Sequence, residues 1–263
     1  MIISFVSIKG GVGKTTLAIE TASSLANDHG KKVLLVDANF SAPNVALNLG
    51  MKSDGTLHDI LAGKIRNLGN VTYEAHGFDF VPASLEYKDP IYFLKLRDVL
   101  EKVKDKYDFI IIDSSPNTHE LLPVLAASDK IFIITTPDLP TMITSARAAQ
   151  IAVIRKTPIA GIIINKIRHP SYEHSLDEIE EKFGIPVVAK VKDDKEMLES
   201  VFYYKPHNIH KSGSATSNEI RRFAGSLAGN PEKVSWFMKN FGFGKMGKEQ
   251  VNRELMRKKL YDL

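Results

Sequence analysis

Residues 2–16 read IISFVSIKGGVGKTT, an apolar run that passes directly into a glycine-rich turn. The run has the composition of a buried β-strand. Apolar side chains then recur at helical spacing at Leu17, Ala18, Ala22, Leu25 and Ala26. A strand, a glycine loop, a Lys-Thr pair and a helix in this order predict a phosphate-binding loop. A plain glycine-rich turn is the alternative, and the placement of Lys14 and Thr15 argues against it.

The loop has the chemistry needed to hold phosphate groups. Glycines allow successive backbone N–H groups to curl around phosphate oxygens, and the N-terminus of the following helix adds the positive end of its dipole. We expect Lys14 to reach the β and γ phosphates of a nucleotide and the Thr15 hydroxyl to ligate Mg²⁺.

The rest of the chain alternates short apolar runs with longer segments of helical period. The expected strands are Ile2–Ile8, Val33–Asp37, Phe78–Pro82, Phe109–Asp113, Ile131–Thr135, Ile159–Asn165 and Pro186–Lys190. The expected helices are near Lys14–Asp28, Tyr92–Asp105, Met142–Arg155, Asp177–Phe183 and Ser217–Leu227. Several strands are apolar at consecutive positions, as strands buried on both faces are. The pattern predicts an α/β fold, a doubly wound, mostly parallel sheet of about seven strands with helices on both faces.

Composition excludes several classes of protein. The 263 residues are 43% hydrophobic and 25% charged, as in an ordinary globular chain. The absence of cysteine excludes a disulfide scaffold, a cysteine nucleophile, a thiolate zinc site and a cysteine-ligated iron–sulfur cluster. The longest apolar runs have about seven residues, whereas a membrane-spanning helix needs about 20. No basic leader or small-residue cleavage site is visible near Met1, so we expect a cytoplasmic protein.

Charge divides the chain near the turn Gly229-Asn230-Pro231. The net charge of +4 combines +5 in residues 233–263, with eight Lys or Arg against three acids, and −1 in residues 1–232. We therefore expect an α/β domain at residues 1–229 and a basic helical tail at residues 230–263.

The glycine turn departs from the common phosphate-loop pattern, because Ile8 stands where the first glycine is expected. What fits is x-K-G-G-x-G-K-T-T, and here the sequence resembles the MinD/ParA family of deviant Walker A P-loop ATPases, above all its MinD-like branch. The resemblance extends over roughly residues 1–228 and implies the P-loop NTPase fold, with ATP or ADP and Mg²⁺ as cofactors. It places the phosphates on Gly10, Gly11, Val12, Gly13, Lys14, Thr15 and Thr16.

In this family the additional lysine, here Lys9, crosses a dimer interface and contacts the ATP of the partner subunit. A cation supplied in trans makes ATP binding and dimerisation a single equilibrium. The resemblance therefore implies an ATP-dependent homodimer in which Lys9 and Lys14 both act in catalysis. Solvation of the loop rim is the alternative role for Lys9.

Two further segments resemble the switch regions of the family. Val36–Asn44 looks like its switch I, and Ile112–Pro116 is similar to its Walker B and switch II. The resemblance implies that Asp37 and Asp113 act in catalysis and bind Mg²⁺ together with the loop threonine. An acid at the end of a buried strand beside the loop suits a hydrogen bond from a Mg²⁺-bound water. The alternative is that Asp113 caps a helix starting near Asn117.

The strand end at Ile162–Lys166 matches the adenine-reading segment of the family. We expect Asn165 to pair with the base, with Lys166 beside it, because an amide offers both a donor and an acceptor to the adenine edge. Capping of a turn is the alternative role for Asn165. The segment that contains Val191 and Asp193 looks like the family loop that packs against the base, so both are placed near the purine.

Two positions depart from the family pattern, and both concern hydrolysis. Asn39 stands where switch I usually has a second acid that orients the attacking water, and an amide cannot take up a proton usefully. Switch II lacks its usual glycine and has Asn117 there. We expect slow hydrolysis and a long-lived ATP state, because phosphoryl transfer depends mainly on positioning and electrostatics.

The tail contains two helical candidates. The first has one apolar face, formed by Val234, Phe237, Met238 and Phe241. Such a face with lysines opposite is typical of a helix lying in a membrane surface, and the MinD branch anchors itself in this way, which suggests membrane contact through residues 233–243. Packing of this face on the ATPase core is the alternative.

The second candidate is Lys248–Leu263, with Val251, Leu255 and Leu260 expected on its apolar side. Its basic residues, which could contact lipid headgroups, nucleic acid or an acidic protein or form a solvated face, are Arg253, Arg257, Lys258 and Lys259.

The preferred function is a MinD-like positioning switch, in which an ATP-bound dimer binds a membrane and a protein partner until hydrolysis releases it. A ParA-like ATPase that coats DNA nonspecifically and a nucleotide-gated scaffold with little hydrolysis are the alternatives. A metallocluster carrier of the same superfamily is set aside, because its bridging cysteines are absent.

Overall fold

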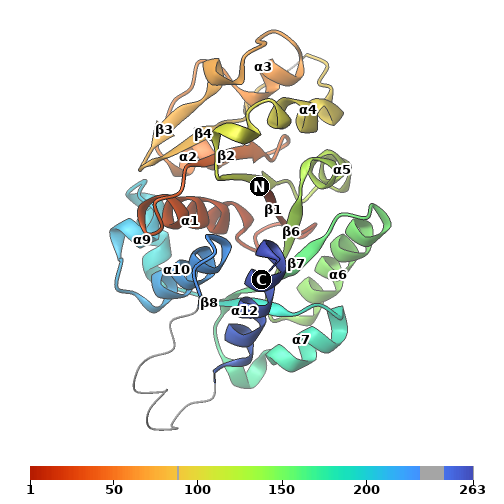
Figure 1. Cartoon of the computed structure of the whole chain (residues 1–263), viewed down its shortest axis with the longest axis vertical. Helices are drawn as coiled ribbons and strands as arrows, with labels where there is room; N and C mark the ends of the chain where they lie inside the picture. Colours follow the sequence, from red (N-terminus) through yellow and green to blue (C-terminus); the bar gives the residue numbers. More distant parts are fainter. Residues whose placement is uncertain (88, 232–245, 263) are drawn as a thin grey trace.

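The computed structural model describes residues 1–87, 89–231 and 246–262. Within them runs an eight-stranded sheet with the order β3-β4-β2-β5-β1-β6-β7-β8 (Figure 1). Its strands are β1 (Ile2–Val6), β2 (Val33–Ala38), β3 (Tyr73–Ala75), β4 (Phe78–Val81), β5 (Phe109–Ser114), β6 (Lys130–Thr135), β7 (Ile159–Ile167) and β8 (Val187–Lys192). The order places β1 and β5, which carry the two candidate phosphate-site segments, next to each other in the centre of the sheet.

The predicted mostly parallel sheet is confirmed, and it has one strand more than expected. β3 pairs antiparallel with β4, with Tyr73 opposite Phe80, while the other neighbouring strands pair in parallel. β3 is only three residues long, which is too short for an alternating pattern to stand out. His76 and Gly77, both at positive φ, turn the chain from β3 into β4.

Helices surround the sheet. They are α1 (Lys14–Asn27), α2 (Val45–Asn48), α3 (Leu57–Leu61), α4 (Leu96–Glu101), α5 (Thr118–Ala127), α6 (Leu139–Ile154), α7 (Leu176–Phe183), α8 (Lys195–Phe202), α9 (His207–His210), α10 (Ala215–Leu227) and α12 (Lys248–Tyr261). Short 3₁₀ turns are η1 (Leu68–Val71), η2 (Phe93–Lys95), η3 (Lys104–Lys106) and η4 (Pro170–Tyr172).

Several helical segments differ from the sequence prediction, and the helices α2, α3, α8 and α9 were not among those expected. The helix expected over Tyr92–Asp105 is divided into η2, α4 and η3. α5 was considered only as the helix that Asp113 would cap and was not among the helices expected, and it contains Pro123 in its interior. Its N-cap is Asn117, whose side chain accepts the His119 N–H, so capping of this helix is not the role of Asp113.

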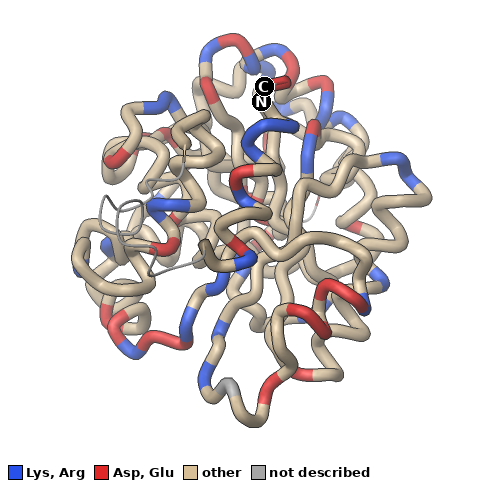
Figure 2. Tube along the Cα trace, turned by 60° about the horizontal axis from the view of Figure 1, so that its bottom comes forward, with Lys and Arg blue, Asp and Glu red and all other residues tan. Residues whose placement is uncertain are grey.

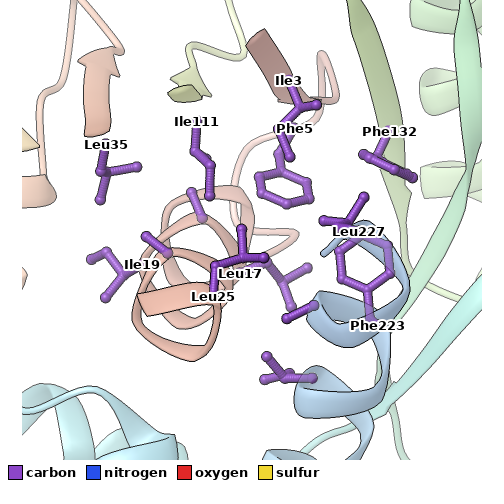
Figure 3. Packing of buried hydrophobic residues seen from close by; sticks show 14 of the residues in the cluster. Ile3, Phe5, Leu17, Ile19, Leu25, Leu35, Ile111, Phe132, Phe223 and Leu227 are labelled. Atoms are coloured by element: carbon purple, nitrogen blue, oxygen red, sulfur yellow. The ribbon is translucent and has the colours of Figure 1, made fainter. Parts of the chain in front are cut away.

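Alternate residues of the central strands supply two cores. Ile3 and Phe5 of β1 point to the face covered by α1 and α10, as Figure 3 shows. Phe132 lies edge-on to Phe223 of α10, with ring centroids 5.0 Å apart. On the opposite face, side chains such as Ile2 pack with α3, α4, α5, α6 and α7. This burial on both faces is the reason why the central strands are apolar at consecutive positions.

The C-terminal helix α12 packs against β8 and α10 (Figure 1). Arg253 is fully buried and its Nη1 lies 2.7 Å from Glu219 of α10 and 3.1 Å from the Val188 carbonyl of β8. The neighbouring Asn252 donates to the Val187 carbonyl at 2.9 Å. α12 therefore occupies backbone acceptors along β8, the last strand of the sheet.

The predicted apolar side of this helix is wrong in two positions. Val251 and Leu255 are 43% and 52% exposed, whereas Met256 is buried and Leu260 packs against the core. The face that turns inward is fixed by the buried ion pair of Arg253, a contact that sequence periodicity cannot show. For the same reason Arg253 is not part of a solvated basic surface, and Arg257 pairs with Glu254 at 2.5 Å.

Along the Cα trace of the described part, basic and acidic residues are interspersed (Figure 2). In that part of the chain, no helix combines the length and the apolar character needed to cross a membrane. The first tail candidate, with Val234, Phe237, Met238 and Phe241, lies outside the described residues.

Candidate functional site

The glycine turn between β1 and α1 has the backbone that only glycine adopts without strain. Gly11 and Gly13 have φ of +78° and +95°, and Gly13 is the N-cap of α1. A Cβ at Gly13 would lie 2.2 Å from the Asn165 side-chain nitrogen, so a larger residue would also collide with β7. The first turn of α1 thus directs its backbone N–H groups toward the loop.

Lys14 lies inside this turn. Its side chain is buried, and its Nζ donates to the Lys9 carbonyl at 3.3 Å. Burial lowers the pKa of Lys14, while the charge of Asp113 raises it in part. An ammonium group that is withdrawn from water and donates to a loop carbonyl is well suited to bind phosphate oxygens.

Thr15 and Asp113 form the second part of the site. The Thr15 hydroxyl donates to Asp113 Oδ2 at 2.6 Å, and Asp113 is fully buried at the end of β5. Among the described residues, Asp113 Oδ1 has no hydrogen-bond partner. A hydroxyl and a carboxylate with a free oxygen are the hard oxygen donors that Mg²⁺ prefers, so these residues fit the cation expected with a nucleotide.

Asp37 lies beside Asp113, because β2 and β5 pair with these two residues in register. Its oxygens accept the backbone N–H groups of Asn39 at 3.1 Å and of Asn44 and Val45 at 3.0 Å each. Burial raises the pKa of Asp37, and the charge of Asp113 raises it further. Burial also raises the pKa of Asp113, against the opposing effects of its hydrogen bond from Thr15 and the charge of Lys14. A cation bound beside the two carboxylates would relieve their repulsion.

Asn39 follows Asp37 in the loop after β2. It is 6% exposed, and its side-chain nitrogen donates to the Ala42 carbonyl at 2.6 Å. In the described part of the chain its Oδ1 has no hydrogen-bond partner. The amide oxygen is therefore available as an acceptor beside the cavity, but it has no basic group to offer a reacting water.

A cavity of about 930 Å³ opens on this loop. The predicted residues that line it are Gly10, Gly11, Gly13, Lys14, Thr15, Thr16, Asn39, Asn165, Lys166, Val191 and Asp193. Asp37, Asp113 and Val12 lie behind its wall and are buried. The Lys9 side chain is exposed and does not line the cavity. The structure therefore brings most of the candidate set together around one space and leaves Lys9 free to project from it.

On the far side of the cavity the strand end of β7 holds the phosphate loop. Asn165 Nδ2 donates to the Val12 carbonyl at 2.7 Å, and Lys166 Nζ donates to the Gly11 carbonyl at 2.7 Å. Lys166 adopts a positive φ of 56°, at a point where the pairing of β7 with β8 is irregular. In this state both side chains position the glycine turn.

Sequence reasoning missed several residues of the cavity wall. Arg168, whose Nε lies 2.5 Å from Asp193 Oδ2, lines the cavity together with Lys195 and Leu198. Arg168 follows Asn165 by three residues, so proximity along the chain could have indicated it. Lys195 and Leu198 belong to α8, which packs there only through the tertiary fold.

Comparison with known proteins agrees with this fold. The profile of a family described as "AAA domain" matches residues 1–157. An ATP-binding protein of Methanocaldococcus jannaschii is 30% identical, over 88% of this chain and 89% of that protein. The septum site-determining protein MinD of Synechocystis is 28% identical, over 85% of this chain and 89% of that protein.

A solved structure shows the same fold. The septum site-determining protein MinD from Pyrococcus horikoshii, complexed with Mg-ADP, superposes with a TM-score of 0.78 at 25% sequence identity. The match covers 90% of this chain and 97% of that chain.

Proposed function

Because this chain belongs to the MinD/ParA family of P-loop ATPases, we propose that it is an ATP-dependent switch that controls the position of a cellular assembly. In this proposal it binds ATP with Mg²⁺, closes as a homodimer around the nucleotide, and hydrolyses ATP slowly to ADP. A protein partner reads or stimulates the ATP state.

The contact between Thr15 and Asp113 carries the nucleotide part of the proposal. It joins the phosphate loop to a buried carboxylate whose second oxygen has no partner among the described residues. The similar MinD from Pyrococcus horikoshii was solved with Mg-ADP, which supports the same ligands here. Mg²⁺, when bound, neutralises phosphate charge.

The residues of the chain divide the remaining tasks. The N–H groups of the glycine turn and the ammonium group of Lys14 bind the phosphate oxygens. Lys14 gives up its contact with the Lys9 carbonyl to do so. Asp113 accepts a hydrogen bond on its free oxygen, and Asp37 holds the loop after β2 in place through three backbone N–H groups.

The amide side chain of Asn39 supports the proposal that ATP hydrolysis is slow. Its amide oxygen can accept a hydrogen bond from the attacking water, yet it cannot take a proton from that water. The same observation favours the second candidate, a nucleotide-gated scaffold with little hydrolysis. The two candidates share the ATP-bound dimer and differ in how long it lasts.

The tail completes the proposal. We assign residues 1–229 to the ATPase domain and residues 230–263 to a tail that contacts a membrane or a protein partner. α12 of this tail is docked on β8 and α10, so it supports the domain as well. Cosedimentation with liposomes and salt-dependent DNA binding, each with and without ATP, separate the MinD-like from the ParA-like function, since DNA binding weakens steeply with salt.

Nucleotide titration with Mg²⁺ tests the core of the proposal. The full chain should bind ATP and ADP, and its mass by light scattering should double in ATP relative to ADP. Lys14→Ala should lose about 100-fold or more in affinity, because a charge-assisted contact to phosphate is removed from a buried site. If the wild-type chain binds neither ATP nor ADP in this titration, the proposal is wrong.

A further inference from the structure

The Glu120 carboxylate joins the two segments that follow the strands carrying the acids of the site. Ser41 lies in the loop of residues 39–44 that follows β2, and Glu120 lies in the first turn of α5, which follows β5. Glu120 accepts the Ser41 hydroxyl and, at 3.2 Å, the Ser41 backbone N–H. The side-chain amide of Asn117 donates to the same carboxylate at 3.4 Å. Three donors from two segments therefore meet on Glu120.

Glu120 is withdrawn from water, since it is 7% exposed. A buried carboxylate is stable only when its oxygens are hydrogen-bonded, and its place in the first turn of α5 adds the favourable end of the helix dipole. Separating Ser41 from Glu120 would leave acceptor positions of a buried charge unfilled. Ser41 and Asn117 are exposed residues, so the strength of the contact comes from the buried end at Glu120.

Contacts other than the one with Glu120 also hold the loop of residues 39–44 in place. Asn39 donates to the Ala42 carbonyl within the loop at 2.6 Å. Phe40 is buried and packs on Phe93, with ring centroids 4.7 Å apart. A loop fixed in this way moves as a rigid unit. Its contact with Glu120 therefore transmits a displacement of the loop to α5, and a displacement of α5 to the loop.

We propose that Glu120 is a positioning residue that makes the loop after β2 and the turn after β5 respond to ATP as one unit. The inference rests on the proposed function, because it requires a nucleotide in the cavity. Asn39 belongs to one segment, and Asp113 lies in β5, one residue before the end of the strand from which the other segment leads. The γ-phosphate, which distinguishes ATP from ADP, thus acts on both segments whichever of them it contacts.

Affinity for ATP relative to ADP measures this coupling. In the full chain with Mg²⁺, Ser41→Ala and Glu120→Gln should each lower the ratio of ATP to ADP affinity about fivefold or more, while ADP affinity changes less than about twofold. In the double variant, the ratio of ATP to ADP affinity should be no lower than in the single variant with the lower ratio, because both changes break the same link. Ser41→Thr keeps the hydroxyl and should restore the ratio.

Ser24→Ala is the matched control. Ser24 is buried in α1, at the end of the helix opposite to the phosphate loop, and its hydroxyl donates to the Asp28 carboxylate at 2.7 Å. This variant should lower the melting temperature in the same way as Ser41→Ala and leave the affinity ratio unchanged.

The outcomes are distinguishable. If the Ser41 and Glu120 variants lower only the melting temperature, Glu120 is a structural residue and the inference is wrong. If the wild type binds ATP and ADP equally well, the segments do not sense the γ-phosphate, and the inference fails while nucleotide binding stands. If the wild type binds neither nucleotide, the proposed function itself fails.

Discussion

Asp37 and Asp113 are neighbours on paired strands, yet the structure uses their carboxylates differently. The carboxylate oxygens of Asp37 accept three backbone N–H groups, from the loop after β2 and the start of α2. Asp113 accepts one hydroxyl, from Thr15, and keeps one oxygen without a partner among the described residues. At the residue scale Asp37 is thus the residue that orders the loop, and Asp113 is the one suited to a cation or its water.

Asn39 is the residue whose substitution tests the expected slow hydrolysis. Asn39→Asp supplies a basic oxygen in place of the amide oxygen beside the cavity, so the rate of phosphate release at saturating ATP should rise roughly tenfold or more. Asn39→Ala, which removes the side-chain acceptor, should not raise it. A rate that stays flat or falls in the aspartate variant would contradict the role assigned to this position.

At the scale of elements, α1 links the phosphate loop to the short helix α9. Glu20 of α1 is buried and accepts the N–H groups of His207 at 2.6 Å and Asn208 at 3.2 Å. Burial raises the pKa of Glu20 to about 7, and these hydrogen bonds lower it in part. α9 follows α8, whose residues line the cavity, so this contact ties one wall of the cavity to the helix that begins at the phosphate loop.

The raised pKa of Glu20 predicts a pH dependence of stability. The folded chain holds the proton of the Glu20 carboxyl more tightly than the unfolded chain, in which the pKa is near 4.5. The stability that this proton contributes is therefore complete below pH 4.5 and is lost as the pH rises through about 7. Its full size is about 3 kcal/mol, since one pKa unit corresponds to about 1.4 kcal/mol. In Glu20→Gln, the free energy of unfolding should therefore fall less between pH 5 and pH 8 than in the wild type.

His207 has the opposite effect on the pH dependence of stability, and it is present in both the wild type and Glu20→Gln. Burial lowers its pKa, so its contribution to stability is lost as the pH falls below its ordinary value of 6.5. Urea unfolding at several pH values, compared between the wild type and Glu20→Gln, isolates the contribution of Glu20. Parallel curves would show that Glu20 does not titrate in this range.

At the scale of the whole molecule, the sheet gathers the phosphate loop, both acids and β7 around one cavity, and Lys9 is exposed outside it. In the proposed function, this position directs the cation away from the nucleotide of its own subunit. It is available to the nucleotide of a second subunit, which is the arrangement expected for an ATP-dependent dimer.

Lys9→Ala tests the arrangement of the dimer. Nucleotide affinity of the monomer should change less than about threefold, whereas the ATP-dependent dimer should weaken at least about tenfold, because a cation that contacts the partner's phosphates is lost. Lys31→Ala, at a partly exposed lysine that follows α1, is the control and should leave both unchanged. Persistence of the ATP-bound dimer in Lys9→Ala would argue that the lysine only solvates the loop.

Much of the fold could be predicted because its signals are local. The order of strands and helices follows from apolar runs and turns between neighbouring residues. Some of the missed elements carry weak local signals: β3 has only three residues, α5 contains Pro123, and α2, α3 and α9 have four or five residues each. The helix α8 was also missed, although it has eight residues. Two of the three residues expected on the inward face of α12, Val251 and Leu255, are exposed, whereas Arg253, which was expected among the basic contact residues, is buried and paired with Glu219.

The sequence by itself determined the phosphate turn, since glycines at positive φ and the lysine and threonine after them act within one short segment. Only the tertiary structure decided which side chains complete the site. Asn165 bonds Val12 across 153 residues, and Glu120 bonds Ser41 across 79. Such contacts depend on the order in which strands pair in the sheet and on how helices cover it, and no pattern among neighbouring residues records that order.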